Sequence, residues 1–304
     1  MERPVRVAVV GEGPAARRFA VAAASVADVD LVPVGDAQAL ILADAAALAE
    51  PAASAIASAG VPTLIDPGVL VSLGATPESR AALRDLRTPA ITALPWRHSP
   101  AVRLARRLLE APKFIHAQVA LQGDDSLPVA ALHTLDILTH LMGRSPSRVY
   151  AESAPGESND PASQSSLAGT LEFGAGGCAA VAVSRLGGAT DRLTAVVQLT
   201  DGRKSVTLSE GFTTATLAGF DDADTDARAD DFALRAVGRS HVVTVDWRPI
   251  DGLAEAIRNL VQTVRAGQAP RDMVDLPSAL RSAALVRAAL AAAGSGRPRR
   301  LVAR

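Results

Sequence analysis

The chain has 304 residues, a length that favours two domains over one. Its formal net charge of −1 excludes the strongly basic footprint of a nucleic-acid or anionic-membrane binder, and an aromatic content of 3% leaves few platforms for stacking bases or sugars. The only cysteine, Cys178, excludes an intramolecular disulfide and fits a reducing compartment. The N-terminal apolar run is too short for a signal peptide and no run reaches membrane-span length, so we expect a cytoplasmic protein.

The N-terminal third alternates short apolar runs with alanine-rich helical stretches. Val5–Val10 is a continuous apolar run bounded by Gly11, which predicts a parallel strand buried on both faces. The elements expected after it are a helix at 14–26, an extended segment at 28–36, a strand at 39–44, a helix at 51–60, a strand at 61–66, a helix at 77–86, a strand at 89–96 and a helix at 99–112. This alternation predicts a Rossmann-like α/β domain over residues 1–112.

From residue 113 the pattern changes to period two. A strand at 114–121 and a helix at 129–143 are followed by alternating runs at 147–153, 167–173, 178–186, 193–200, 204–210, 213–220 and 241–247. Asp201-Gly202 between two runs predicts a hairpin, and the acidic stretch 221–231 predicts a solvated loop. We therefore expect an α+β domain over 113–304 with a large, open-faced, mostly antiparallel sheet, and a final helical segment at 252–293 that packs back.

A glycine-rich turn separates the first strand from the first helix. Its sequence satisfies the G-x-G-x-x-G/A pattern that lets backbone amides approach a pyrophosphate, and the candidate cofactor-binding residues are Gly11, Glu12, Gly13, Pro14 and Ala15. Asp36 falls where an acid that binds the ribose of NAD is expected. The sequence thus predicts NAD or NADP as cofactor, with NAD favoured. The alternatives are a strand–helix turn without a ligand and a solvated turn residue at Asp36.

The segment behind Asp36 is too short for an ordinary dinucleotide fold. Only Ala37 and Gln38 separate Asp36 from the strand at 39–44, whereas a parallel crossover needs about ten or more residues. We expect that the usual helix and strand are deleted here, which makes the domain abridged. Either 30–35 is not a parallel strand, or it continues into 39–44 in an altered way.

Several longer segments, in this order, resemble the Gfo/Idh/MocA family of glucose–fructose oxidoreductase and inositol dehydrogenase. These are WRHSPAVRLARRLL at 96–109, HTLDILTHLMG at 133–143, SRVYAES at 147–153, GTLEFGAGGCAAVAVS at 169–184 and the closing helices at 261–301. The resemblance implies an NAD(P)-dependent oxidoreductase that acts on a sugar, cyclitol or related polyol. It also implies that the open sheet serves oligomerisation.

Two departures from the family pattern concern proton transfer. Where the family carries Glu-Lys-Pro, this chain has Asp66, Pro67 and Gly68, and proline cannot replace the lysine that hydrogen-bonds the substrate. The family's aspartate four residues before the retained His133 is Val129 here. We therefore expect His133 to be the remaining catalytic acid/base, with a rate lowered by several powers of ten, because one positioned acid/base contributes about 10²–10⁴-fold.

The remaining candidates have more than one interpretation. Arg97 and His98 lie between a strand and a helix N-terminus, where ligand contacts are common, so we assign them with Asp136 to substrate binding. Arg97 alternatively braces the domain junction, and Asp136 and His140 are alternatively helix-surface or domain-contact residues. His133 is alternatively a structural histidine with satisfied hydrogen bonds. The spacing of His133, Asp136 and His140 could hold a metal, but the resemblance offers no metal role, and we expect none.

The sequence leaves two functional hypotheses. The first is a divergent NAD(P)-dependent oxidoreductase acting on a small polyol, sugar or related carbonyl compound. The second is a catalytically inactive relative that serves as a binding or assembly module. Both predict a homo-oligomer formed through the open sheet, with no nucleic-acid or membrane partner.

Overall fold

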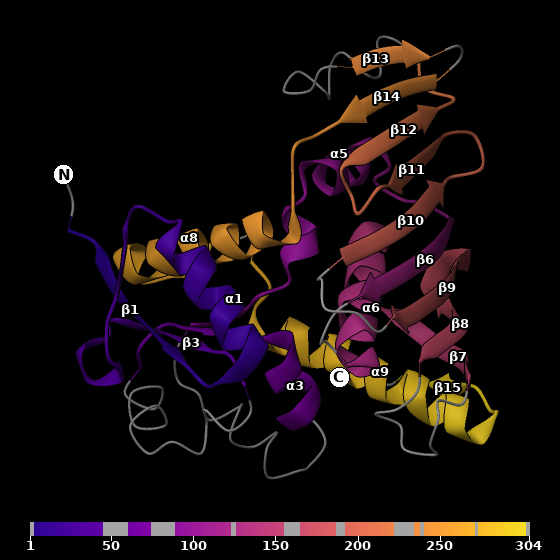
Figure 1. The fold of residues 1–304 in the computed structure, drawn as a ribbon. Coiled ribbons are helices and arrows are strands. Elements are labelled where there is room, and N and C mark those ends of the chain that lie inside the picture. Colours follow the sequence, from indigo (N-terminus) through magenta and orange to yellow (C-terminus); the bar gives the residue numbers. More distant parts are fainter. Residues whose placement is uncertain are drawn as a thin grey trace. The chain divides into compact units, whose positions relative to one another are not determined.

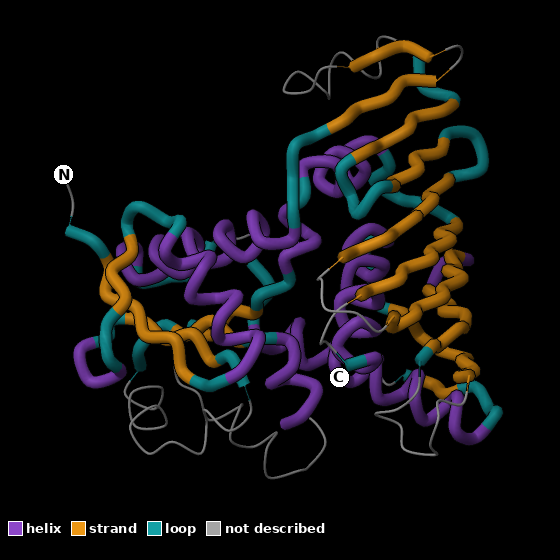
Figure 2. The backbone as a smooth tube through the Cα atoms, viewed as in Figure 1, coloured by secondary structure: helices purple, strands orange, loops and turns teal. Residues whose placement is uncertain are grey.

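The computed structural model describes residues 3–44, 60–73, 89–122, 126–154, 165–186, 192–221, 234–237, 240–270 and 273–301. The chain forms two compact units (Figures 1 and 2). The N-terminal unit comprises Met1–Pro95 and Pro249–Ala284, and the sheet unit comprises Trp96–Arg248 and Leu285–Arg304. The division after Pro95 differs from the boundary expected at 112/113, because helix α5 (Pro100–Leu108) packs on elements of the sheet unit.

The N-terminal unit is built on a parallel sheet with the strand order β2-β1-β3-β4-β5 among the described residues. Its strands are β1 (Val5–Val10), β2 (Val29–Leu31), β3 (Ala39–Leu42), β4 (Thr63–Ile65) and β5 (Ala90–Thr92). Every residue of β3, β4 and β5 is buried, as expected for strands covered on both faces. The expected Rossmann-like domain is therefore present.

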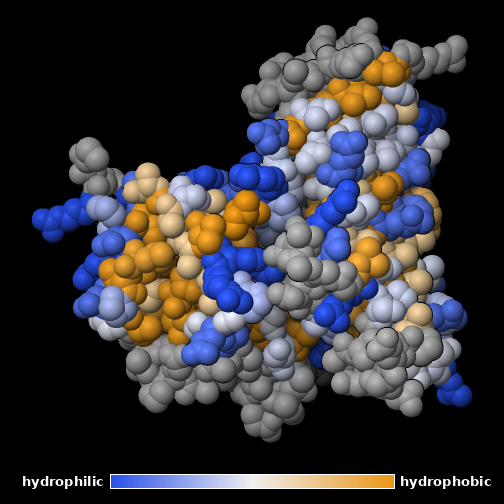
Figure 3. Space-filling view, in the orientation of Figure 1, coloured by the Kyte–Doolittle hydropathy of each residue, from blue (hydrophilic) through white to orange (hydrophobic). Residues whose placement is uncertain are grey.

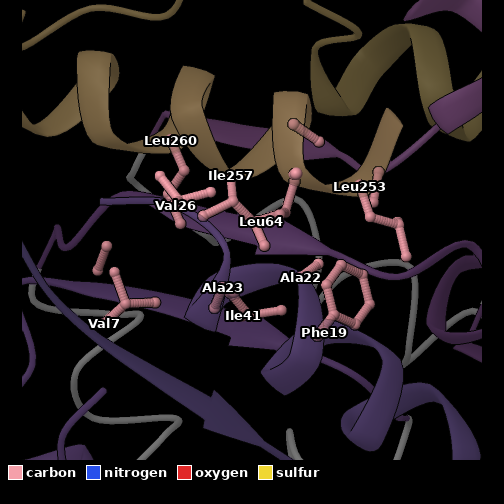
Figure 4. Close-up of a cluster of buried hydrophobic side chains, with 14 of the residues drawn as sticks. Val7, Phe19, Ala22, Ala23, Val26, Ile41, Leu64, Leu253, Ile257 and Leu260 are labelled. Carbon is pink, nitrogen blue, oxygen red and sulfur yellow. The ribbon is translucent and has the colours of Figure 1, made fainter. Parts of the chain in front are cut away.

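The helical elements of this unit are α1 (Gly13–Ala24), η1 (Val34–Asp36), α3 (Pro67–Leu73), α8 (Pro249–Ala266) and the first part of α9 (Leu276–Ser295). Helices α1 and α8 pack together over one face of the sheet (Figure 4). Phe19 of α1 and Ile257 and Leu260 of α8 meet Leu64 of β4 in this core. Gly252 allows the close approach of α8, because a Cβ there would lie 2.5 Å from the carbonyl oxygen of Pro95.

The helices expected at 51–60 and 77–86 fall outside the described residues, apart from Gly60, which lies in a turn. Helix α3 was not predicted.

Apolar surface gathers over the N-terminal unit in the view of Figure 3, and Val21 of α1 is 64% exposed.

The connection from β2 to β3 corrects the sequence interpretation. Strand β2 is parallel but ends at Leu31 rather than continuing to residue 35, so residues 32–38 are available for the connection. Leu31 and Ala39 both pair with Val7 of β1, from opposite edges. Strand β2 ends beside Val7 and β3 begins beside Val7, so the connection only crosses from one edge of β1 to the other. It does not have to run back along the length of a strand before β3 begins. This explains how a crossover much shorter than usual joins two parallel strands.

The sheet unit contains a second sheet with the order β13-β14-β12-β11-β10-β6-β9-β8-β7-β15 among the described residues. Its strands are β6 (Phe114–Gln122), β7 (Pro146–Ala154), β8 (Ser166–Phe173), β9 (Gly177–Leu186), β10 (Arg192–Thr200), β11 (Ser205–Ser209), β12 (Thr214–Ala218), β13 (Leu234–Val237), β14 (Ser240–Thr244) and β15 (Arg299–Arg300). Among the described strands of this sheet, only the central pair β6–β9 is parallel, which confirms the mostly antiparallel sheet. The predicted hairpin at Asp201-Gly202 joins β10 to β11, and Gly202 has φ +97°.

Helix α6 (Leu127–Met142) covers one face of this sheet, where it contacts β6, β8 and β9. It ends at Gly143, whose φ of +71° forms a left-handed cap.

Strands β13 and β15 were not predicted, and the acidic stretch 221–231 lies outside the described residues apart from Asp221. Helix α9 has the length and hydropathy of a membrane span, but Ala279, Ala283 and Val286 are buried inside the protein, as in a core helix.

Candidate functional site

The glycine-rich turn has the backbone geometry that its sequence predicts. Gly11 has φ +118° and Gly13 has φ +83°, conformations that L-residues with a Cβ rarely adopt. Helix α1 follows at once, with Pro14 in its first turn. Within the described part of the chain, a Cβ built on Gly13 would meet no heavy atom within 4 Å. The Gly13 side of the turn therefore has room for an incoming group beside the start of α1.

The Gly11 side of the turn is filled by a carboxylate. Asp44, just after β3, accepts a 2.7 Å hydrogen bond from the backbone N–H of Glu12 through Oδ2. A Cβ built on Gly11 would lie 2.7 Å from the same oxygen. Gly11 is thus required by its φ and also by the approach of Asp44. Sequence reasoning placed Asp44 only at the end of a strand, and no motif in the chain signalled this contact.

Asp36 lies in the exposed helix η1, beside the amino-terminal half of β1. Two hydrogen bonds between the backbone of Arg6 and Gln38 anchor the segment there: Gln38 N–H donates to the Arg6 carbonyl, and Arg6 N–H donates to the Gln38 side chain. The glycine-rich turn follows the other end of β1, at Val10. The register therefore does not bring η1 to the end of the sheet that carries the turn, and a ribose contact by Asp36 stays a prediction.

The segment matched to the family's Glu-Lys-Pro forms the start of a helix instead. Asp66 follows β4 and accepts a 2.7 Å hydrogen bond from the N–H of Gly68, and the buried Pro67 opens α3. An acceptor side chain followed by proline is a favourable helix start. Asp66 and Pro67 therefore have a structural role in this chain.

His133 lies in a buried aromatic cluster of the sheet unit. Its imidazole stacks on the indole of Trp96, with ring centroids 4.9 Å apart, and the indole also contacts the ring of Phe212 at 5.5 Å. Ser99 donates a 2.7 Å hydrogen bond to the carbonyl oxygen of Phe212, which adopts a φ of +72°. The histidine is 9% exposed. Residues before α5, on α6 and in the β11–β12 turn thus fix the orientation of the ring.

Arg97 and Asp136 form a forked ion pair within the sheet unit. Nε and one Nη of Arg97 donate hydrogen bonds of 2.6 and 2.5 Å to the two carboxylate oxygens of Asp136, whose side chain is 2% exposed. The pair fastens helix η3 (Pro95–His98) to α6. This arrangement supports the bracing interpretation of Arg97, while substrate contacts by Arg97, His98 and Asp136 stay predictions.

His140 lies one turn beyond Asp136 on α6, in positive surroundings. Burial and the nearby charges of Arg97, Arg106 and His98 lower the pKa of His140 to about 3, with burial the largest cause. His140 is therefore neutral at physiological pH. This electrostatic environment could not be predicted from the helix sequence alone, since Arg97, His98 and Arg106 lie on other elements.

The two lysines of the chain, Lys113 and Lys204, both belong to the sheet unit. Lys113 is exposed at the start of β6, and its backbone is bonded to Thr200 and Cys178. The ammonium of Lys204 lies 5.1 Å from the centroid of the Phe220 ring. Among the described residues, no three His, Cys, Asp or Glu side chains lie together in a way that could hold a metal ion.

The fold is that of known dehydrogenases. No family model and no curated protein sequence matches the chain. Among solved structures, it is similar to UDP-N-acetylglucosamine 3-dehydrogenase GnnA from Acidithiobacillus ferrooxidans, at 16% identity over 97% of this chain and 99% of that chain, with a TM-score of 0.73.

Two further similar structures are a putative myo-inositol dehydrogenase from Sinorhizobium meliloti and GenD2 from gentamicin A biosynthesis in complex with NAD. The first is 14% identical over 98% of this chain and 100% of that chain, with a TM-score of 0.70. The second is 18% identical over 100% and 98%, with a TM-score of 0.69. These similarities confirm the Rossmann-like domain followed by a large sheet domain.

Proposed function

We propose that the protein is a divergent oxidoreductase of the Gfo/Idh/MocA type that binds NAD or NADP at the glycine-rich turn. The observation that carries this proposal is the geometry of β1, the turn and α1, with Gly11 and Gly13 at positive φ and no described heavy atom within 4 Å of a Cβ built on Gly13. Amides at a helix N-terminus favour a pyrophosphate. The NAD complex of GenD2, which shares the fold, agrees with a nicotinamide cofactor.

His133 is the proposed proton-transfer residue. A nicotinamide dinucleotide would supply the hydride acceptor or donor, and the protein would supply the matching proton transfer at the substrate oxygen. The stacked Trp96 holds the imidazole in one orientation, and the pair of Arg97 and Asp136 anchors the helix that carries it. Pro67 in the lysine position has no side-chain proton donor, and the neighbouring Asp66 accepts a hydrogen bond from the N–H of Gly68. A small polyol, sugar or related carbonyl compound is the proposed substrate, in line with the names of the similar enzymes.

Fluorescence of NADH and NADPH tests the cofactor half of the proposal. We expect a saturable enhancement on adding protein, followed by reduction of NAD or NADP in the presence of one compound from a panel of polyols and sugars. Binding without turnover on any panel compound, in both reaction directions, would contradict the enzymatic half.

The second candidate function is a catalytically inactive binding or assembly module. Asp44 favours it, because a carboxylate already satisfies the Glu12 amide in the turn, and Pro67 favours it because the family's proton donor is absent. An inactive module whose turn is closed by Asp44 predicts no thermal stabilisation by any nicotinamide dinucleotide. An oxidoreductase predicts stabilisation of about 2.7 kcal/mol when the free dinucleotide is at a hundred times its dissociation constant.

We also propose a cytoplasmic homo-oligomer assembled through the face of the large sheet opposite α6. Val196, Gln118, Ala182 and Ala168 pair in a row across β10, β6, β9 and β8, on the face where Val196 is 41% exposed. The side chains of this row are small and mostly apolar, which suits a flat contact between the sheets of two protomers. Val196→Glu should lower the mass measured by light scattering, whereas Val21→Glu on α1 should leave it unchanged.

A further inference from the structure

We infer that Asp44 is a built-in anion that competes with the diphosphate of a nucleotide for the amides of the glycine-rich turn. It is thereby the residue that sets the affinity of the turn for such ligands. With a dinucleotide as ligand, the inference rests on the proposed function. For diphosphates in general it rests on the contacts of Asp44 alone.

The first step is the number of donors in the turn. Diphosphate recognition at a helix N-terminus depends on backbone N–H groups that no helical carbonyl satisfies. Pro14 has no N–H to offer. The N–H of Glu12 donates to Asp44. Among the described residues, the amides of the turn without an acceptor are chiefly those of Gly13 and Ala15, fewer than the G-x-G-x-x-A sequence suggests.

The second step is the position of the charge. Oδ2 of Asp44 lies where a Cβ of Gly11 would be crowded, so the carboxylate is inside the curve of the turn. A phosphate that approaches the same amides meets a like charge at close range. A like charge at this distance weakens the binding of the phosphate. A diphosphate that spans both glycines therefore requires the Asp44 side chain to turn away from the turn.

The third step separates the two sides of the turn. Gly13 has open space, whereas Gly11 is in contact with Asp44. A ligand can thus enter on the Gly13 side while the Gly11 side is held by the protein itself. Removing the charge of Asp44, with its shape retained, should extend the site across both glycines.

The test compares ADP binding by the wild-type protein and by Asp44→Asn, using isothermal titration calorimetry. The amide oxygen of the variant can still accept from Glu12, so the fold of the turn is kept while the charge is lost. We expect Asp44→Asn to bind ADP about tenfold to a hundredfold more tightly. Asp44→Ser serves as a second variant, with a shorter neutral side chain, and thermal melting checks that each variant is folded.

Asp30→Asn is the matched control. Asp30 lies on β2 of the same sheet, opposite Arg6 in the amino-terminal half of β1, so the variant makes the same change in net charge away from the turn. We expect its ADP affinity to equal that of the wild type. Equal ADP affinity in the wild type, Asp44→Asn and Asp44→Ser, including no binding by any of them, would overturn the inference. An equal gain in Asp30→Asn would also overturn it.

The same titrations with NADH distinguish this inference from the proposed function. If Asp44→Asn gains affinity for ADP but no form of the protein binds NADH or transfers hydride, the inference holds and the oxidoreductase proposal fails. If the wild type binds NADH tightly and Asp44→Asn binds it and ADP no better, the oxidoreductase proposal stands and the inference fails.

Discussion

The two candidate sites of this molecule differ in what their surroundings do to the functional groups. In the N-terminal unit, the backbone of the glycine-rich turn has the expected conformation, but the side chain of Asp44 occupies part of it. In the sheet unit, Val129 stands where the family resemblance predicts an aspartate, yet the imidazole of His133 stacks on Trp96. The glycine-rich turn thus keeps its expected backbone conformation, although Asp44 changes which of its amides can bind a ligand. His133 likewise keeps a defined position against Trp96, although the residue four positions before it is Val129.

The largest expected effect concerns His133. Replacement by alanine should lower turnover on a true substrate by about 10²–10⁴-fold, because the only proposed acid/base is removed. The dissociation constant for NADH should be unchanged. His241→Ala on β14 is the control, because it removes a histidine that pairs with Leu217 of β12 and that has no proposed catalytic, binding or assembly role. Turnover that survives in His133→Ala would exclude the residue from the mechanism.

The ion pair of Arg97 and Asp136 should contribute strongly to stability. Arg97→Ala leaves a carboxylate buried without its forked donor, which should cost about 3 kcal/mol in the free energy of unfolding. Arg258→Ala removes an exposed pair with Glu255 on α8 and should cost less than about 1 kcal/mol. Urea denaturation of both variants measures the contrast. A loss in Arg97→Ala no greater than in Arg258→Ala would show that the pair does not brace η3.

The two glycines of the turn should respond unequally to substitution. Gly11→Ala combines an unfavourable φ with a contact on Asp44, and should lower the free energy of unfolding by about 2–3 kcal/mol. Gly13→Ala meets no described atom and should lose only about 1 kcal/mol through its φ. Thermal unfolding compares them. Equal losses would show that Asp44 does not press on Gly11 in solution.

The smallest effect is a pH dependence from His140. Its pKa is about 3 in the folded protein and near 6.5 when unfolded, so between these pH values the unfolded chain binds a proton that the folded chain does not. Stability should therefore fall on acidification from pH 6.5, by at most about 1.4 kcal/mol per pH unit from this group. His140→Gln should flatten that slope in urea titrations at pH 4.5–6.5. An unchanged slope would show that His140 is protonated in the folded protein.

Much of the fold follows from local sequence patterns. The strand Val5–Val10, the glycine turn, the alternating strands and the hairpin at Asp201 depend on neighbouring residues, and the structure confirms them. The end of β2 at Leu31 could not be predicted, because it is set by the register on β1 rather than by the propensity of residues 32–35.

The contacts that define the sites were the least predictable part. The partner of Asp44 lies 32 residues away, and that of Arg97 lies 39 residues away. Such pairs depend on tertiary packing and leave no periodic signal in the chain. The residue types of Gly11, Gly13 and His133 led to the predicted ligand and proton-transfer sites, whereas only the structure revealed Asp44 in the turn and Trp96 on the histidine.

The most direct test of the account is calorimetric titration of NADH into the wild-type protein and into Gly13→Asp. The substitution adds a carboxylate to the open side of the turn, and aspartate tolerates positive φ better than most residues. The account predicts saturable binding by the wild type that is abolished in Gly13→Asp. Binding of equal strength in both proteins, or no binding by the wild type, would contradict a dinucleotide site at the glycine-rich turn.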